Sequence, residues 1–233
     1  LLSVDLMNSG FLSDYDYTKL IFTATNNRKL NKLIFRSRAF FQFGNGSNWA
    51  PESKLYLSGS NLENMMNNKF TRSKGFINSE YLGYGESINH FHHSGGLNLR
   101  GYSGYLAPEY DDNGNFDFFG YCGTSGGSIN LEIEFTSLIP RSINTIGIKP
   151  YIFGDVGIIT NKELSRENFI DTFSEIRADA GIGFFFNISQ WTPLETVNPL
   201  TVRLDFPLFL NRPPANDNDY FMFRWLFGIS KLF

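Results

Sequence analysis

One short stretch of the sequence combines glycines with a single arginine, in the order Gly-Gly-Leu-Asn-Leu-Arg-Gly-Tyr from Gly95 to Tyr102. The glycines on both sides of Arg100 permit backbone conformations that other residues avoid, so the chain can fold tightly there. The guanidinium of an arginine offers five N–H donors in a rigid fork, which matches the geometry of carboxylates. The stretch therefore predicts an arginine presented to acidic partners. The simpler alternative is an exposed glycine-rich turn with a solvated side chain.

Acidic residues that could meet this arginine lie in two later segments whose residues alternate between apolar and polar. Glu132 and Glu134 fall within 128–136, and Asp155 falls within 146–159. Successive side chains of a β-strand point to opposite faces, so all three carboxylates occupy the polar face of their strands. The alternation therefore predicts a strand face that carries acids, opposite a face that carries aliphatic residues.

The composition excludes several classes of function. The net charge of −3 gives no electrostatic basis for binding nucleic acid. No run of about 18 apolar residues occurs, so helical membrane spans are excluded. Cys122 is the only cysteine, which excludes an intrachain disulfide and a cysteine-built metal site. Motifs of serine hydrolases, zinc peptidases and phosphate-binding loops are absent, so these residues predict no catalytic residue, no cofactor and no enzymatic activity.

Three histidines occur close together, as His90, His92 and His93. Metal binding requires further ligands in a fixed geometry, and this spacing matches none of the familiar metal sites. We therefore expect no metal here, and a cluster of histidines at the surface near a loop.

The same alternation recurs over most of the chain and predicts an all-β protein. The abundance of aromatic residues, with 25 Phe and 11 Tyr, and the 22 Gly are typical of strands joined by turns. Asn26–Lys29 is expected to form a tight turn between the first two long strands. Leu1–Met7 is a candidate strand, and the clearer strands are 15–26, 32–44, 128–136, 146–159, 176–187, 201–210 and 223–233.

The ends of these strands indicate the kind of sheet. Strands of about ten residues joined by alternately short and long connections are the signature of a transmembrane β-barrel. The connection 140–144 is short, whereas 161–175 and 211–219 are longer. Lipid permits no open sheet edge, so such strands must close into a barrel around a polar lumen. A soluble β-sandwich or a plain porin is the weaker alternative, since its strands also alternate.

A long polar stretch interrupts the strands. From Asn45 to about His93 the residues Gly, Ser, Asn and Pro dominate, and Met65 and Met66 mark a short helix-like patch. Loops of this length in a compact domain are usually functional or disordered. We therefore expect one domain, 1–233, with a long loop region at 45–125 that contains the motif 95–102.

Several motifs in a fixed order resemble the BamA-like barrels of outer-membrane protein assembly factors and two-partner-secretion transporters, the bacterial surface antigen family. Leu99-Arg100-Gly101-Tyr102 matches the [Val/Ile/Leu]-Arg-Gly-[Phe/Tyr] motif of the family's inward-folded loop. The motifs that follow in the family are a Gly-Gly strand start, aromatic-x-Asp-x-Gly, Arg-x-x-x-Gly-x-Gly and a strand ending in aromatic-Pro. Their matches are Gly126–Pro140, Phe153–Gly157, Arg177–Gly183 and Phe206–Pro207.

The resemblance covers about Gly95 to Phe233 and implies a fold and a location. The chain would be the C-terminal part of a sixteen-stranded transmembrane antiparallel β-barrel in the bacterial outer membrane, with the Arg-Gly-Tyr loop folded inward. The terminal strand would carry the targeting signal, formed by Phe223, Trp225, Phe227, Gly228 and Phe233. The implied partners are outer-membrane lipid and lipopolysaccharide, unfolded outer-membrane protein or exported polypeptide, periplasmic chaperones and assembly lipoproteins.

The resemblance also implies roles for the polar residues. Arg100 would pair with Asp155, with Glu132 or Glu134 as a neighbouring acid. We expect the remaining charged residues of the polar faces to pair across the lumen; they are Arg36, Arg38, Arg177, Asp179, Arg203 and Asp205. The implied function is outer-membrane protein assembly and insertion or protein translocation. The alternative is a barrel that anchors a fused surface or periplasmic hydrolase, such as a peptidase, phosphoesterase or lipase, encoded upstream of Leu1.

Overall fold

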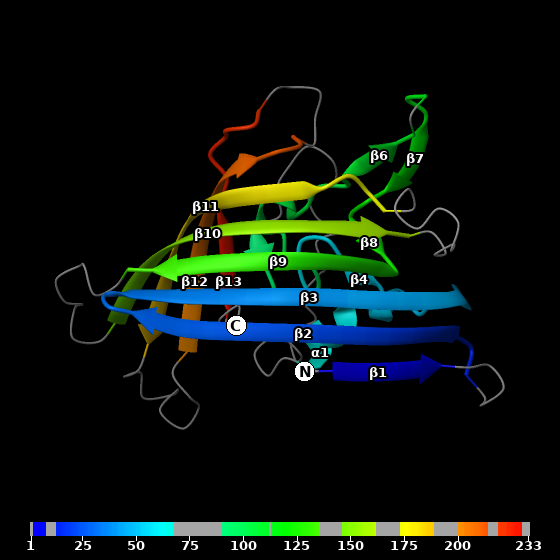
Figure 1. Cartoon of the computed structure of the whole chain (residues 1–233), viewed down its shortest axis with the longest axis horizontal. Coiled ribbons are helices and arrows are strands. Elements are labelled where there is room, and N and C mark those ends of the chain that lie inside the picture. The colour runs from blue at the N-terminus through cyan, green and yellow to red at the C-terminus, as the bar shows by residue number, and fades with distance from the viewer. Residues whose placement is uncertain are drawn as a thin grey trace.

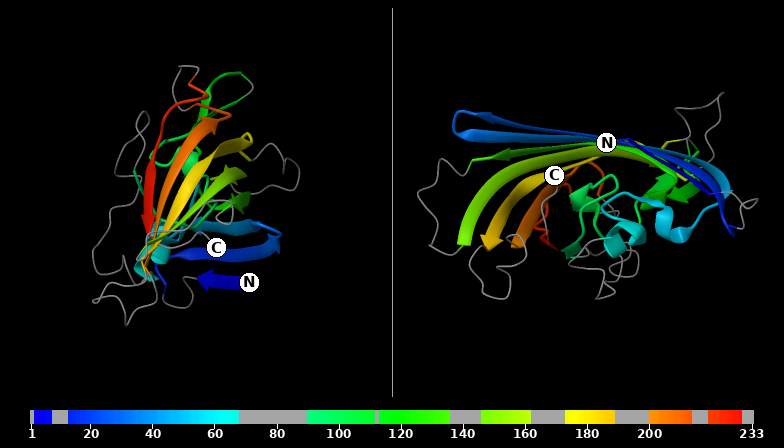
Figure 2. Two further views of the ribbon diagram at one scale, coloured as in Figure 1. Left: turned by 90° about the vertical axis from the view of Figure 1, so that its left-hand side faces the viewer. Right: turned by 90° about the horizontal axis from the view of Figure 1, so that it is seen from below.

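The computed structural model describes residues 2–7, 13–67, 90–111, 113–135, 146–161, 173–188, 200–213 and 219–229. One strongly curled sheet of nine strands dominates the chain and has the shape of half a barrel (Figure 1, Figure 2). The fold is therefore all-β, as the alternation predicts. In their order across the sheet the strands are β1 (Leu2–Met7), β2 (Asp16–Leu30), β3 (Leu33–Asn48), β9 (Ser125–Glu134), β10 (Ile146–Thr160), β11 (Arg177–Ile188), β12 (Leu200–Leu210), β13 (Leu226–Ile229) and β5 (Phe91–His92).

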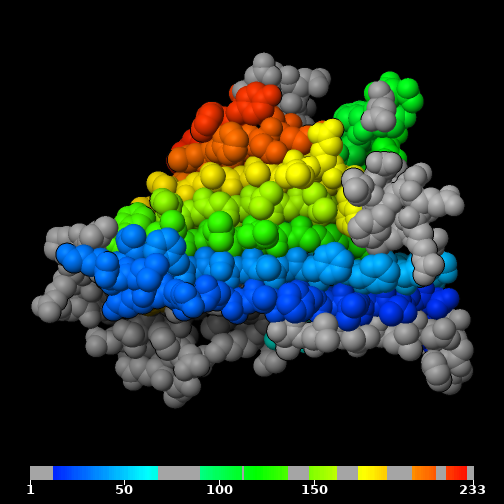
Figure 3. Space-filling view, viewed as in Figure 1, coloured from blue at the N-terminus to red at the C-terminus, as the bar shows by residue number. Residues whose placement is uncertain are grey.

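The two faces of this sheet have opposite characters. On β9, Ile129 and Leu131 are each 51% exposed, whereas Asn130 and Glu132 are 0% and 1% exposed. The same alternation continues on the neighbouring strands, which place aliphatic and aromatic residues on the convex face and charged residues on the concave face. Figure 3 looks onto the convex face, where the strands from β2 to β12 lie side by side. A sheet with water on its convex side would carry polar side chains there and apolar ones on its concave side. The distribution in this sheet is the reverse.

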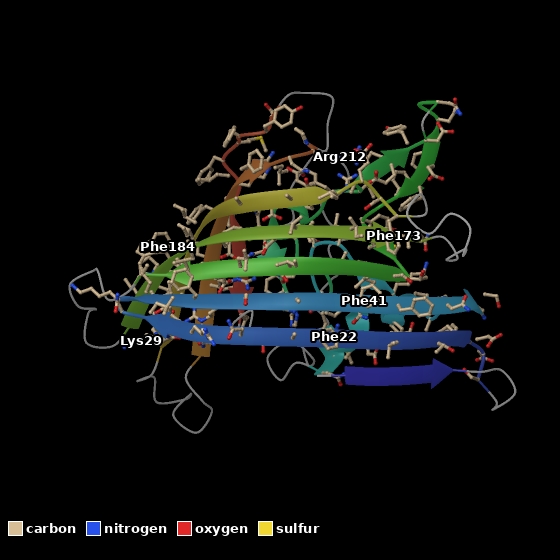
Figure 4. All side chains as sticks on the ribbon, in the orientation of Figure 1. Phe22, Lys29, Phe41, Phe173, Phe184 and Arg212 are labelled. Atoms are coloured by element: carbon tan, nitrogen blue, oxygen red, sulfur yellow. The ribbon has the colours of Figure 1, made fainter. Side chains whose placement is uncertain are left out.

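The pairing of β2 with β3 shows how the register assigns the faces. Phe22 lies opposite Phe41, and both side chains are exposed on the convex face (Figure 4). The turn between the strands falls at Asn31 and Lys32, where Asn31 adopts a left-handed φ of 53° that asparagine tolerates. Asn26–Lys29 continue β2, so the predicted turn at that position is wrong.

Residues 49–124 join β3 to β9, and we call them the β3–β9 connection. Their described parts fold against the concave face of the sheet (Figure 2). The helix indicated by Met65 and Met66 is present, and the predicted loop region 45–125 begins within β3, which continues to Asn48. Besides β5, the elements of the connection are η2 (Pro51–Ser53), β4 (Leu55–Tyr56), α1 (Leu62–Asn67), η4 (Arg100–Tyr102), β6 (Pro108–Tyr110), β7 (Phe116–Phe119) and β8 (Cys122–Gly123).

An apolar core lies between the connection and the sheet. Its buried members are Phe40, Ile159 and Leu210 from the sheet and Leu55, Leu57, Leu97, Leu99, Tyr102, Tyr105 and Ala107 from the connection. Each fully buried leucine contributes roughly 1.5 to 3 kcal/mol through the hydrophobic effect. Apolar packing therefore holds the connection on the concave face and positions η4 above the central strands.

Within the described residues the last strand, β13, is shorter than the predicted segment 223–233. Residues 230–233 and the predicted short connection 140–144 lie outside the described residues. None of the helices that the structure describes is long and apolar enough to cross a membrane.

Candidate functional site

The segment 95–102 crosses the concave face of the sheet through a sharply turned backbone. Gly96 has a φ of 52°, in the left-handed region that favours glycine. A Cβ atom at Gly96 would lie 2.4 Å from the carbonyl oxygen of Gly59, closer than any real side chain approaches. Leu99 follows and is fully buried in the core. These contacts fix the direction in which the next side chain, Arg100, points.

Arg100, the first residue of η4, is fully buried among carboxylates from three strands. Its Nε and Nη2 donate to Oδ2 and Oδ1 of Asp155 on β10 at 2.7 and 3.0 Å, a two-point contact. Its Nη1 donates to Oε1 of Glu132 on β9 at 2.9 Å and lies 3.9 Å from Oδ1 of Asp205 on β12. We name these four residues the Arg100 cluster. Each nitrogen of the guanidinium therefore faces an acid.

The surroundings of Arg100 favour its charged form. The central carbon of the guanidinium, Cζ, lies 3.7 Å from the centroid of the Phe153 ring, at cation–π distance. Burial by itself would lower the pKa of Arg100, but the adjacent Asp155, Asp205 and Glu132 outweigh burial and raise this pKa above its ordinary value. Arg100 therefore stays a cation throughout the ordinary pH range.

The two residues after the arginine attach η4 to β11 and β12. The amide of Gly101 donates to Oδ2 of Asp179 at 3.0 Å. A Cβ atom at Gly101 would lie 2.4 Å from Cδ2 of Leu210, so glycine is the residue that fits. The hydroxyl of Tyr102 donates to Oδ1 of Asn211 at 2.9 Å, and burial raises the pKa of Tyr102 to about 12. The Arg-Gly-Tyr motif thus contacts four strands of the sheet.

The structure places Asp155 against Arg100, as the resemblance implies. Of the two glutamates that the resemblance leaves open as the neighbouring acid, Glu132 contacts Arg100, whereas Glu134 pairs with Arg36 on β3. Glu132 and Glu134 share a face, but they lie about 7 Å apart along the strand, so only one is level with the arginine. Of the predicted targeting residues, Phe223, Trp225 and Phe227 are exposed, Gly228 pairs with β5, and Phe233 lies outside the described residues.

Besides Glu132 and Asp155, three polar residues of the strands contribute to the site. In the sequence, only their position on the polar face of a strand marks them. Nδ2 of Asn130 donates to Oδ1 of Asp155 at 3.0 Å and to the carbonyl oxygens of Leu97 and Asn98, each at 3.2 Å. The other two are Asp205 and Tyr151, whose hydroxyl donates to Oδ1 of Asp205. Asp205 also pairs with Arg203 of its own strand at 2.6 Å, rather than across the lumen as expected.

A second buried ionic group lies at the base of the β6–β7 hairpin. Glu109 is 4% exposed and accepts hydrogen bonds from Nε of Arg177 at 3.0 Å and from Nη1 of Arg212 at 2.9 Å. We name these three residues the Glu109 cluster. It joins the hairpin to the start of β11 and to the residues after β12. The acidic character of the loop sequence around Glu109 gives no indication of this burial.

The expectation of a surface cluster is wrong for His92 and His93, which are 2% and 6% exposed, whereas His90 is exposed. His92 and His93 are buried because this part of the β3–β9 connection folds against the concave face of the sheet. The rings of His90, His92 and His93 have separate partners, namely the ring of Trp225, the carbonyl oxygen of Ser58 and the hydroxyl of Ser60. Within the described ranges, no group of three His, Cys, Asp or Glu could hold a metal ion.

The charges of the Arg100 cluster are paired with one another. The guanidinium donates to two carboxylates and lies close to a third, so its hydrogen-bonding capacity holds the loop to the sheet. No protein-family model matches this chain, and no curated protein matches it either.

Proposed function

We propose that this chain forms part of an outer-membrane β-barrel of the BamA-like kind, which inserts outer-membrane proteins or translocates polypeptide. The observation that carries the proposal is the Arg100 cluster. A loop arginine lies in the concavity of a curled sheet and is held by acids of β9, β10 and β12. Asp155 is the acid that the resemblance implies as the partner of Arg100, and Glu132 is one of the two neighbouring acids that it leaves open.

The polarity of the sheet supports a location in the membrane. Large apolar side chains such as Phe22, Leu131 and Ile152 are exposed on the convex face, while Arg203 and Asp205 are fully buried on the concave face. Proteins in water seldom expose so many apolar side chains on one face. An apolar exterior around a polar interior is what a transmembrane barrel requires, because lipid cannot hydrate charged groups. The membrane-spanning segments would be β1 to β3 and β9 to β13.

In this proposal the β3–β9 connection occupies the lumen and performs no bond-making chemistry. The client would be an unfolded outer-membrane protein or an exported polypeptide, delivered by periplasmic chaperones, with assembly lipoproteins beside the barrel. The surrounding lipid and lipopolysaccharide would contact the convex face.

The test is an insertion assay with the protein reconstituted in vesicles of outer-membrane lipid. An unfolded outer-membrane protein is added, and its folded, heat-modifiable fraction is followed with time. We expect the reconstituted protein to accelerate folding, and Arg100→Ala and Asp155→Asn to abolish most of the acceleration. Arg28→Ala, at an exposed position on β2, is the matched control and should behave as wild type.

Equal folding rates in empty vesicles and in vesicles with the wild-type protein would contradict a role in assembly. Release of an externally added, exported polypeptide across the vesicle would then decide in favour of translocation. Hydrolysis of peptide, phosphoester or lipid substrates by the intact protein would favour the anchoring role instead.

A further inference from the structure

The free side of β13 is covered by two residues of the β3–β9 connection. β5 pairs with β13 in parallel, with Phe91 opposite Phe227 and His92 opposite Gly228. The amide of Phe227 donates to the carbonyl oxygen of His90 at 2.6 Å. A pairing of two residues is too short to be stable by its backbone hydrogen bonds alone. Side-chain contacts must therefore hold β5 on this edge.

His92 supplies such a contact. Its side chain is buried, its Nε2 lies 2.6 Å from the carbonyl oxygen of Ser58, and its Nδ1 faces Nη2 of Arg203 on β12. A carbonyl oxygen can only accept a hydrogen bond, and a guanidinium can only donate one. Nε2 must therefore carry the proton, and Nδ1 must be an acceptor. The geometry is satisfied by a neutral imidazole alone.

Among the residues that the structure describes, the charges around His92 offer no partner for a second proton. The charged and titratable groups that act on it are Arg203 from β12, Arg100 from η4 and His93 beside it, while Asp205 on β12 pairs with Arg203. Asp205 is engaged by Arg203 at 2.6 Å and lies close to Arg100. Burial, and then the charge of Arg203, lower the pKa of His92 well below its ordinary value. A proton on Nδ1 would point at a guanidinium.

We propose that His92 makes the pairing of β5 with β13 sensitive to acid: the neutral imidazole holds β5 on the edge, and proton uptake at Nδ1 releases it. The proton comes from water, and only hydrogen bonds break. Release frees the edge of β13, which then presents unpaired backbone groups. This inference stands apart from the proposed function, because it concerns an equilibrium within the chain and not what the barrel handles.

The sign of the pH effect follows from proton linkage. The released state binds one more proton than the paired state, so acid favours release. The pairing keeps its full stability above about pH 6.5, the ordinary pKa of a histidine. Below that value the equilibrium constant for release should rise by about tenfold for each pH unit, until the lowered pKa of the paired state is reached.

Hydrogen exchange of the Phe227 amide measures this equilibrium directly, because that amide donates to β5. The folded protein in detergent micelles is compared at about pH 7.5 and about pH 5, after correction for the intrinsic pH dependence of exchange. We expect protection of the Phe227 amide to fall by about thirtyfold between these two values, as one proton with a released-state pKa of about 6.5 requires. Amides of the β9–β10 ladder should keep their protection.

The decisive variant is His92→Asn, which keeps an acceptor near the position of Nδ1 but does not titrate. We expect its protection at Phe227 to be independent of pH, whatever its absolute level. His90→Asn removes the neighbouring exposed imidazole and should keep the wild-type dependence. The proposal is overturned if wild-type protection is the same at both pH values. It is also overturned if the dependence survives in His92→Asn, or if His93→Asn abolishes it.

Discussion

Three nitrogens of the Arg100 guanidinium face carboxylates on three different strands. The planar fork allows this, whereas the ammonium of a lysine is a single point charge on a flexible stem. All members of the Arg100 cluster are almost fully buried, so none can exchange its partner for water. Loss of the Arg100 charge therefore leaves Asp155 buried without the cation that bonds it at two points.

At the residue scale we predict that Arg100→Lys destabilises the protein even though it keeps the charge. Removal of one partner from a buried ion pair costs about 3 to 5 kcal/mol of folding stability. Arg100→Lys should incur a large part of this cost, because a lysine cannot bond Asp155 at two points. The measurement is the urea midpoint of unfolding from vesicles. Arg28→Lys, at an exposed position, is the control. Equal midpoints for all three proteins would show that the bidentate contact does not stabilise the fold.

The pairing of Arg100 with Asp155 could be anticipated because two independent signals agree on it, the alternation of β10 and the motif order. The partner of Glu134 could not be anticipated. Which of the two glutamates, Glu132 or Glu134, contacts Arg100 depends on where η4 lies along the strands. The burial of His92 could not be anticipated either. A His-Phe-His-His sequence carries no sign that Arg203, more than a hundred residues later, will face the imidazole.

At the scale of elements, the β6–β7 hairpin depends on one acid. Glu109 lies on the inner side of β6, where the Glu109 cluster attaches it to β11 and β12. The outer side of the hairpin exposes Tyr110, Phe116 and Phe119, whose rings pack on one another. The Glu109 cluster thus attaches the hairpin to the sheet from its inner side.

We predict that Glu109→Gln loosens the hairpin without unfolding the sheet. Arg177 and Arg212 would lose their shared acid, so cleavage of the hairpin by added protease should become at least about tenfold faster. Glu175→Gln provides the control, because the side chain of Glu175 is 74% exposed and lies 3.3 Å from Arg212. Exposed ion pairs contribute only about 0 to 1 kcal/mol, so this change should have little effect. Similar cleavage rates in both variants would contradict the assigned role of Glu109.

Most of the long strands could be located from the period of two alone, because each has one apolar and one polar face. The hairpin between β2 and β3 was harder to place, because Asn26 and Asn27 are typical turn residues yet lie within β2. The ladder continues to Leu30 because its partner strand begins at Leu33, so pairing overrides the local preference. The short elements of the connection have no such period, and their positions depend on packing against the sheet.

At the scale of the whole molecule, the exposed apolar face favours the proposed barrel in lipid over a soluble sandwich. We predict that Leu131→Arg, at the middle of β9, costs about 2 to 4 kcal/mol when the protein unfolds from vesicles, because a charge in mid-bilayer is poorly solvated. Leu30→Arg, at the end of β2, is the matched control and should cost about 0 to 1 kcal/mol.

If the convex face were in water instead, both arginine substitutions would change the free energy of unfolding by less than about 0.5 kcal/mol. Unfolding from vesicles, monitored by tryptophan fluorescence at several urea concentrations, separates these outcomes.

The adjacency of β3 and β9 has a consequence for how the protein can vary. Because these strands pair directly, from Ile34 opposite Glu134 to Gln42 opposite Gly126, the chain leaves and re-enters the sheet at the same end. The β3–β9 connection begins and ends at that one end of the sheet, so no ladder hydrogen bond between β3 and β9 depends on its length. Insertions and deletions within this connection can therefore be tolerated without a change in the register of β3 and β9, provided that Arg100, Glu109 and β5 keep their contacts with the sheet.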